Sequence, residues 1–198
     1  MIKFYDLGLI EYKDFLTIQE ELTPLKEDIL LFCRHYPIFT TGKNDNNYPW
    51  ALKVDRGGSI TYFDEGTLMV YFIFNVTNPA LFFRKIRKIF DIFFDGIAMY
   101  DKAKPGYYIE NKKIASLGFS YKNNRSNHGI AINVNTNLVE FNKIRPCNLS
   151  KVKATSLYNE NIDLKMGEIK MKLKEIISLV FGENYETENN SSIKGANR

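Results

Sequence analysis

Cys147 is the residue with the greatest capacity for covalent chemistry in this sequence. It lies in a polar, turn-like segment, residues 144–148 (IRPCN), and the chain has only one other cysteine. A cysteine attacks as its thiolate, so a nucleophilic role requires a positive neighbour and access to a substrate. No histidine lies within a few residues, and a lone cysteine is otherwise a small buried hydrophobic residue. The residues alone leave both interpretations open, and a base must come from elsewhere in the chain.

Lys113 is a candidate for acid–base chemistry. It begins a predicted strand whose next residues, Ile114 and Ala115, are apolar. A lysine partly buried among them would lose solvation and its pKa would fall, which is what an acid–base lysine needs. An exposed lysine next to a hairpin turn explains the same pattern, so the residues do not choose between the two interpretations.

A glycine pair in residues 56–62 (RGGSITY) is a candidate for ligand binding. Two glycines allow the backbone to turn tightly and to approach a ligand, and Arg56 can hold a carbonyl or an anion with its fork of donors. A plain β-turn explains the pair equally well. The spacing matches neither a Walker phosphate loop nor a dinucleotide-binding fingerprint.

The cysteines and histidines give no sign of a metal site or of a disulfide. His35 and His128 have no second ligand at metal spacing, and Cys33 and Cys147 occupy unrelated positions. Cys33 lies within an apolar run, residues 29–34, and is assigned to the core. Without a disulfide framework, a reducing, cytoplasmic setting is expected.

The composition indicates a single folded domain without a membrane segment. The 198 residues are 44% hydrophobic, which is enough to bury a sizeable core. The N-terminus lacks the basic-then-apolar order of a signal peptide, and polar residues and a proline interrupt the long uncharged run at 66–83. The net charge of +4 is smaller than the clustered excess typical of nucleic-acid binding, although it suits an acidic protein partner. A soluble protein, by default a monomer, is expected.

The elements that must position these residues include both strands and helices. Runs rich in β-branched and aromatic residues predict strands over residues 2–10, 29–34, 51–55, 59–62, 67–74, 107–109, 113–121 and 129–134. Apolar residues at helical spacing predict helices over 12–26, 79–99 and 166–181. The second helix begins at the capping pair Asn78-Pro79, and Pro24 marks the end of the first. Hairpin turns at 110–112 and 122–127 make an antiparallel sheet the expected arrangement.

Two further segments carry charge or polarity. The helix over 79–99 bears four basic residues on its other side, either as an ordinary solvated face or as a docking surface for an acidic partner: Arg84, Lys85, Arg87 and Lys88. Residues 184–198 are polar and poor in apolar side chains, so they are expected to form a flexible tail after a domain spanning 1–183.

Six blocks of the sequence together resemble one protein family. In chain order they are residues 35–43 (HYPIFTTGK), 55–62 (DRGGSITY), 113–118 (KIASLG), 128–138 (HGIAINVNTNL), 145–147 (RPC) and 155–157 (TSL). Their order and content resemble the lipoyl(octanoyl) transferases, over residues 2–157 or about three quarters of the chain. One such block would be weak evidence, whereas six collinear blocks are strong.

The resemblance implies a fold and an activity. The fold would be that of the biotin- and lipoate-protein ligase catalytic domains, an α/β (α+β) fold with a mixed, mainly antiparallel sheet flanked by helices, and residues 1–183 would be one catalytic acyltransferase domain. The activity would move an octanoyl group from octanoyl-acyl carrier protein to a lysine of lipoyl-domain proteins, such as glycine cleavage H protein and 2-oxoacid dehydrogenase E2 subunits. No ATP, metal or other cofactor is implied, because the thioester donor is already activated.

The resemblance also implies roles for individual residues. Cys147 matches the cysteine that attacks the acyl thioester and holds the octanoyl group, and Lys113 matches the lysine beside it. Its ammonium would stabilise the thiolate, and its neutral amine would accept a proton from the incoming lysine. The implied substrate-binding positions are Arg56, Gly57, Gly58, Ser59, Ile60, Thr61, Tyr62, Phe63, Ser116, Leu117, Gly118, Gly129, Ile130 and Ala131.

This chain departs from the family pattern at two positions. Family members commonly have a histidine where this chain has Phe63, which keeps the packing of a ring but forms no hydrogen bond. The glycine that usually follows the cysteine is Asn148, which tolerates the same left-handed backbone at some cost. Because Cys147 and Lys113 both persist, the departures indicate a lineage variant of the enzyme.

Two other functions stay open. An ATP-dependent lipoate-protein ligase would share the glycine-rich strand and the lysine but would not need the cysteine, so Cys147 in its Arg-Pro-Cys context argues against it. A non-catalytic acyl-binding protein would retain the pocket, and Phe63 is its only support.

Overall fold

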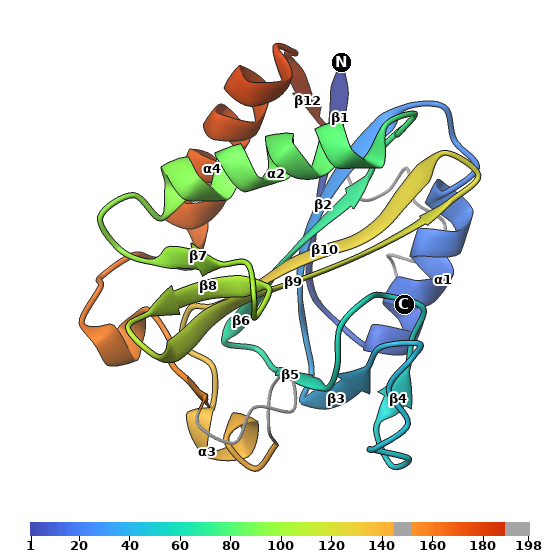
Figure 1. Ribbon diagram of the computed structural model, residues 1–198. Coiled ribbons are helices and arrows are strands. Elements are labelled where there is room, and N and C mark those ends of the chain that lie inside the picture. The colour runs from blue at the N-terminus through green and yellow to red at the C-terminus, as the bar shows by residue number, and fades with distance from the viewer. Residues whose placement is uncertain (145–151, 189–198) are drawn as a thin grey trace.

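A large mixed sheet forms the centre of the molecule (Figure 1), and the computed structural model describes residues 1–144 and 152–188. Among these residues, nine strands form this sheet in the order β12-β1-β2-β6-β10-β9-β8-β7, with β11 paired to β9. β1 is parallel to β2 and β12, and β11 to β9, whereas the other neighbours are antiparallel. The sheet is therefore mixed and mainly antiparallel, as predicted. Its strands are β1 (Ile2–Ile10), β2 (Asp28–His35), β6 (Thr67–Ile73), β7 (Met99–Asp101), β8 (Gly106–Ile109), β9 (Lys112–Lys122), β10 (Arg125–Asn133), β11 (Lys153–Ala154) and β12 (Tyr185–Thr187).

A second, three-stranded sheet lies beside the first and has the order β4-β3-β5. Its strands are β3 (Ile38–Thr41), β4 (Leu52–Lys53) and β5 (Thr61–Phe63). The helices are α1 (Tyr12–Leu22), α2 (Pro79–Phe93), α3 (Leu138–Phe141), α4 (Met166–Phe181) and the 3-10 helix η2 (Tyr158–Glu160).

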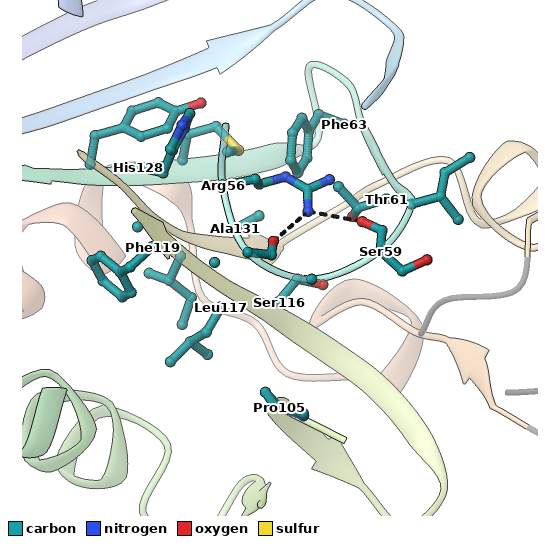
Figure 2. A pocket seen from close by; sticks show the side chains of 18 of the residues that line it. Arg56, Ser59, Thr61, Phe63, Pro105, Ser116, Leu117, Phe119, His128 and Ala131 are labelled. Atoms are coloured by element: carbon teal, nitrogen blue, oxygen red, sulfur yellow. Dashed lines mark hydrogen bonds between the residues drawn. The ribbon is translucent and has the colours of Figure 1, made fainter. Parts of the chain in front are cut away.

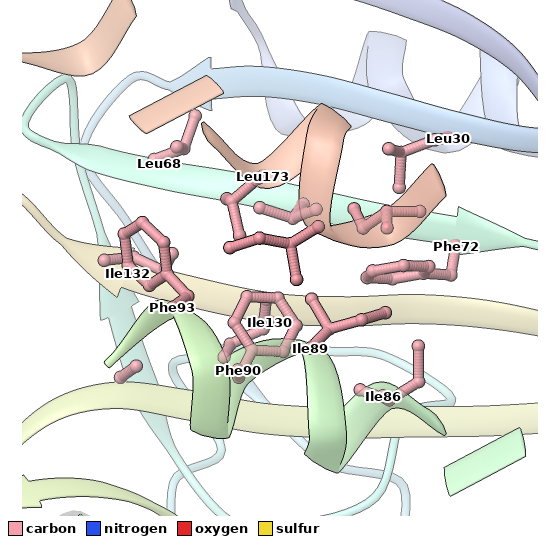
Figure 3. Packing of buried hydrophobic residues seen from close by; sticks show 14 of the residues in the cluster. Leu30, Leu68, Phe72, Ile86, Ile89, Phe90, Phe93, Ile130, Ile132 and Leu173 are labelled. Atoms are coloured by element: carbon pink, nitrogen blue, oxygen red, sulfur yellow. The ribbon is translucent and has the colours of Figure 1, made fainter. Parts of the chain in front are cut away.

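α2 and α4 lie together over one face of the large sheet and bury the main hydrophobic core (Figure 3). Phe90 and Phe93 of α2 and Leu173 of α4 are fully buried against Phe72 of β6 and Ile130 of β10. Burying a side chain of this size stabilises the fold by about 1.5–3 kcal/mol. This packing fixes β6 and β10, the strands that carry part of the cavity wall on the opposite face.

α1 covers the other face of the large sheet. Phe15 and Ile18 of α1 pack with alternate residues of β6, among them Tyr71, in a second buried cluster. Alternate residues of a strand point to opposite faces, which is why β6 supplies Phe72 to the first core and Tyr71 to the second. Phe63 of the small sheet joins this second cluster, so the small sheet is attached on the same face as α1.

Most predicted elements are confirmed, and the differences have local causes. Asn78 caps α2 as expected, its side chain accepting a hydrogen bond from the backbone N–H of Leu81. α1 ends at Leu22, and Pro24, which has no backbone N–H to continue the helical hydrogen bonds, follows closely. α2 ends at Phe93 rather than near Met99. Gly96 has a φ of +68°, which breaks the helical path, and Met99 begins strand β7.

Four short strands were not predicted, namely β3, β7, β11 and β12. β12 pairs with β1 and lies inside the segment expected to be a flexible tail, so ordered structure continues beyond residue 183. Cys33 is fully buried in the second core cluster, which confirms its assignment to the core. No helix in the described ranges has the length and apolar character needed to cross a membrane.

Candidate active site

Three separate sequence blocks meet around one cavity of about 200 Å³ (Figure 2). The loop that begins at Arg56 forms one wall, and the ladder between β9 and β10 forms another. An apolar cavity of roughly 150 Å³ holds a benzene ring, so this volume suits a short acyl chain. The lining residues are Tyr12, Arg56, Gly57, Gly58, Ser59, Ile60, Thr61, Phe63, Met69, Tyr71, Pro105, Lys113, Ser116, Leu117, Gly118, Phe119, His128, Gly129, Ile130 and Ala131.

Nearly all predicted binding positions line this cavity. The exception is Tyr62, which points to the other side of β5 and packs against Phe39 and Phe141. Alternation along a strand explains the difference, because Thr61 and Phe63 face the cavity and the residue between them does not. Tyr62 is therefore a packing residue of the small sheet.

Arg56 builds the cavity wall from within. Its guanidinium is buried and donates hydrogen bonds to the carbonyl oxygens of Gly57 and Ser59 at 2.9 and 2.8 Å, and to that of Thr40 at 2.9 Å. The sequence allowed Arg56 to hold a carbonyl or an anion, and the carbonyls it holds belong to its own loop and to β3. Gly58 has a φ of +81°, the left-handed conformation that glycine adopts without cost. The arginine and the glycine together fix the loop against β3.

The β9–β10 ladder brings bare backbone to the cavity. Gly118 of β9 is paired with Gly129 of β10, so neither strand presents a side chain at this level. A Cβ atom on Gly129 would lie 1.9 Å from the carbonyl oxygen of Val70, which excludes any other residue there. Close packing thus requires Gly129, whereas a Cβ on Gly118 would crowd Arg56 Cδ and the Gly57 carbonyl oxygen, each at 3.2 Å.

Lys113 is buried in the cavity wall. Its side chain is 4% exposed, and its ammonium lies 5.8 Å from the centre of the Tyr108 ring. Gly106 of β8 makes room for it, since a Cβ there would lie 2.5 Å from Lys113 Cε and 3.2 Å from Nζ. Of the two interpretations that the sequence left open, the buried lysine is the correct one.

Cys147 lies outside the described residues, but both flanks of its segment are fixed beside Lys113. The side-chain oxygen of Asn142 accepts a hydrogen bond from the backbone N–H of Ala154 at 2.9 Å, which joins the two flanks. Ala154 is paired with Lys113 through β11, and the next N–H, of Thr155, donates to the Lys113 carbonyl at 2.9 Å. The backbone on either side of residues 145–151 is therefore attached next to the buried lysine.

Phe63 occupies the position where the family pattern has a histidine. It is buried, lines the cavity and stacks on Tyr12, with 6.2 Å between ring centres and 16° between ring planes. Its surroundings are largely apolar, so its ring serves as a wall of the cavity.

His128 is a polar cavity residue to which the sequence gave no role. It is 2% exposed, and its Nε2 lies 2.5 Å from Asp55 Oδ1. The hydrogen bond from His128 lowers the pKa of the Asp55 carboxyl below its usual range. The two residues are 73 positions apart, and only the fold brings them together. Tyr12, Met69, Tyr71, Pro105 and Phe119 were likewise missed as cavity residues, because only the tertiary structure places them there.

Comparison with known proteins assigns the chain to a family. The model of the lipoyl protein ligase A/B catalytic domain matches residues 12–178. The chain belongs to this family. Within it, the chain is 33% identical to an octanoyltransferase of Wigglesworthia glossinidia brevipalpis, over 83% of this chain and 85% of that protein. It is 34% identical to an octanoyltransferase of Buchnera aphidicola, over 78% and 80%. The resemblance seen in the sequence is confirmed, and the chain is an enzyme of the acyltransferase class.

Solved structures agree on the fold. A lipoate-protein ligase A bound with ATP superposes with a TM-score of 0.78 at 15% identity, over 98% of this chain and 92% of that one. A bipartite lipoate protein ligase from Thermoplasma acidophilum gives 0.74 at 14% identity, over 98% and 89%. A biotin protein ligase from Aquifex aeolicus gives 0.52 at 16% identity, over 91% and 70%. The predicted biotin- and lipoate-protein ligase fold is confirmed.

Proposed function

We propose that this enzyme transfers an octanoyl group from octanoyl-acyl carrier protein to the target lysine of a lipoyl domain, through a thioester on Cys147 with Lys113 as the acid–base partner. The observation that carries the proposal is the burial of Lys113 in the cavity wall, directly paired with the strand that leaves the Cys147 segment. The octanoyltransferase relatives support the transferred group.

Chain connectivity allows the cysteine to reach the lysine. Ile144 is buried in one cluster with Ala154 and with Ile60, which lines the cavity. Cys147 follows Ile144 by three residues, so an extended chain places it at most about 11 Å away. Ala154 of the same cluster is paired with Lys113, so this reach supports a nucleophile that meets the lysine.

Two balanced steps account for the transfer. In the first, the Cys147 thiolate attacks the thioester carbonyl, the bond to the carrier's sulfur breaks, and the Lys113 ammonium protonates the departing thiolate. In the second, the acceptor lysine amine attacks the acyl-cysteine, the C–S bond to Cys147 breaks, and the neutral Lys113 amine takes the proton from the new amide nitrogen. Lys113 ends protonated beside a thiolate, the state in which the cycle began.

The cavity walls suit an alkyl chain. Apolar side chains surround it, namely those of Phe63, Met69, Leu117, Phe119 and Ile130. The paired glycines Gly118 of β9 and Gly129 of β10 leave it open along these two strands. Burying eight carbons at roughly 0.8 kcal/mol each sets a ceiling of about 6 kcal/mol for recognition of the chain. That energy is available before any contact with the carrier or the acceptor protein forms.

The test is transfer from octanoyl-acyl carrier protein to an apo lipoyl domain without ATP, followed by mass spectrometry of the acceptor. Lys113→Met, which keeps the length of the side chain but not its charge, should reduce transfer by about 100-fold or more. Lys122→Met, at the exposed far end of the same strand, is the matched control and should keep the wild-type rate.

ATP separates the alternatives in the same assay. The neighbouring folds include lipoate ligases, so free octanoate with ATP is the second arm. Modification only in that arm would make the enzyme a ligase and overturn the proposal. Equal rates for wild type and Lys113→Met would remove the lysine from the mechanism, and no modification in either arm would leave an acyl-binding protein.

A further inference from the structure

His128 and Asp55 form a polar pair at the cavity whose hydrogen bonding is incomplete. His128 has a φ of +65°, an unusual conformation for this residue, and its ring lines the cavity (Figure 2). Its Nε2 meets Asp55 Oδ1, and Asp55 Oδ2 also accepts a hydrogen bond from Ser120 Oγ at 3.2 Å. Asp55 itself is largely exposed, so the pair connects the cavity wall with the surface.

The charge of Asp55 fixes the tautomer of the histidine. Its pKa is lowered, with the hydrogen bond from His128 as the largest cause, so the carboxylate is ionised and the shared proton lies on Nε2. Nδ1 is then the ring nitrogen left to accept a hydrogen bond. It is buried, and no hydrogen-bond partner for it exists among residues 1–144 and 152–188. Buried polar atoms nearly always have a partner, so an open acceptor at a ligand cavity indicates a group that a ligand supplies.

The distance along the sheet places this acceptor at the far end of the acyl chain. The Lys113 ammonium lies against Gly106, which is paired with Ser116, whereas His128 is paired with Phe119. Three residues of strand separate these two levels, or about 10 Å. An extended peptide advances at most about 3.6 Å over the three backbone bonds of a residue, or roughly 1.2 Å per bond. At the same advance per bond, the seven C–C bonds of an octanoyl chain span roughly 8 Å. A chain whose carbonyl is at Lys113 therefore ends near His128.

We propose that His128 is a specificity-determining residue, whose Nδ1 accepts a hydrogen bond from a hydroxyl or thiol on the last carbons of the acyl chain. Asp55 acts as a positioning residue that holds the acceptor tautomer. The cavity then takes eight-carbon chains that carry a terminal hydrogen-bond donor in addition to the plain octanoyl chain. The inference rests on the proposed function, because it assigns a binding partner to the end of the acyl chain opposite the reacting carbonyl.

The test compares kcat/KM for carrier-protein thioesters of 8-hydroxyoctanoate, 8-methoxyoctanoate and 4-hydroxyoctanoate. The methoxy chain keeps the oxygen but donates no hydrogen bond, and the 4-hydroxy chain places the donor far from His128. We expect the 8-hydroxy chain to be preferred over each by at least tenfold in the wild-type enzyme. Equal values for the hydroxy and methoxy chains would overturn the inference without any mutation.

Variants at His128 separate recognition from folding. His128→Phe should reduce the preference for the 8-hydroxy over the 8-methoxy chain at least fivefold. His128→Asn should retain it, because Asn tolerates the left-handed backbone and places an acceptor oxygen near the position of Nδ1. The same preference in both variants and in wild type would contradict the assignment.

Binding of the free acids distinguishes failure of this inference from failure of the proposed function. Titration calorimetry with 8-hydroxyoctanoate and 8-methoxyoctanoate requires no chemistry. A preference in binding with no transfer from any thioester would refute the proposed reaction and keep the subsite. Transfer with no preference in either measurement would keep the reaction and refute the subsite.

Discussion

Gly106 provides a sharp test of how Lys113 is positioned, because the atoms nearest to a Cβ built on this glycine belong to the Lys113 side chain and to the backbone of Ala115. In Gly106→Ala the new Cβ would lie 2.5 Å from Lys113 Cε and 2.7 Å from the carbonyl oxygen of Ala115. Ordinary contact requires about 3.5 Å, so Cε must move by about 1 Å, carrying Nζ with it. The Ala115 carbonyl belongs to the central ladder and moves less easily.

A displacement of this size has a calculable effect on catalysis. Misplacing a reacting group by about 1 Å costs up to 100-fold in rate, which corresponds to about 2.7 kcal/mol in the activation barrier. The same crowding should lower the free energy of unfolding by about 1–3 kcal/mol. We therefore expect kcat/KM for octanoyl transfer to fall by about 10- to 100-fold. The rates of the variant and the wild type are measured at a temperature where the variant remains folded.

Gly96→Ala is the matched control. Gly106 has a φ of +157° and Gly96 one of +68°, so both substitutions strain the backbone, but a Cβ on Gly96 meets no atom within 4 Å. This variant should lose about 1–2 kcal/mol of stability through backbone strain and keep its catalytic rate. Circular dichroism melts give the stability of both variants, and steady-state transfer assays give the rates. Full activity of Gly106→Ala, or an equal loss of activity in Gly96→Ala, would refute the claim that Lys113 is positioned by the space that Gly106 leaves.

Three further predictions follow from buried groups outside the reaction. Burial lowers the pKa of His35 to about 4. The stability that the neutral, buried ring contributes is complete above the unfolded-state pKa near 6.5 and is lost as the pH falls toward 4. About 3 kcal/mol of the free energy of unfolding should therefore disappear over this pH range in denaturant melts, and His35→Gln should flatten the dependence of stability on pH. Burial raises the pKa of the Cys33 thiol, so brief alkylation of the native protein should label Cys147 and spare Cys33, as peptide mapping will report. Asn133 donates hydrogen bonds from Nδ2 to the carbonyls of Lys113 and Thr155; Asn133→Ala should lower the free energy of unfolding by about 1–3 kcal/mol and reduce transfer, whereas equal activity and stability would exclude its role in joining β9 to β11.

The sequence predicts the long elements well because their signals are local, and most of the positions it names for binding line the cavity. The apolar spacing in α4 and the cap at Asn78 need no tertiary information. β11 has only two residues and exists because it pairs with Lys112 and Lys113, so no local pattern announces it. The burial of Lys113 likewise depends on Gly106, seven positions earlier on another strand.

The polar part of the site was the least predictable. The sequence indicates Arg56 as a ligand-binding group, whereas its hydrogen bonds stabilise the loop that lines the cavity. Tyr62 was included with its neighbours although strand alternation turns it away. The pairing of His128 with Asp55 joins two motifs that the chain separates by 73 residues, and only the fold makes that contact.

The central claim is that the octanoyl group passes through Cys147, and intact-mass spectrometry after incubation with octanoyl-acyl carrier protein alone tests it most directly. The account predicts a single octanoyl adduct on the enzyme, which is mapped to Cys147, is absent in Cys147→Ser and is released when an apo lipoyl domain is added. Failure to form any adduct at high donor concentration, or an adduct that persists in Cys147→Ser, would contradict it.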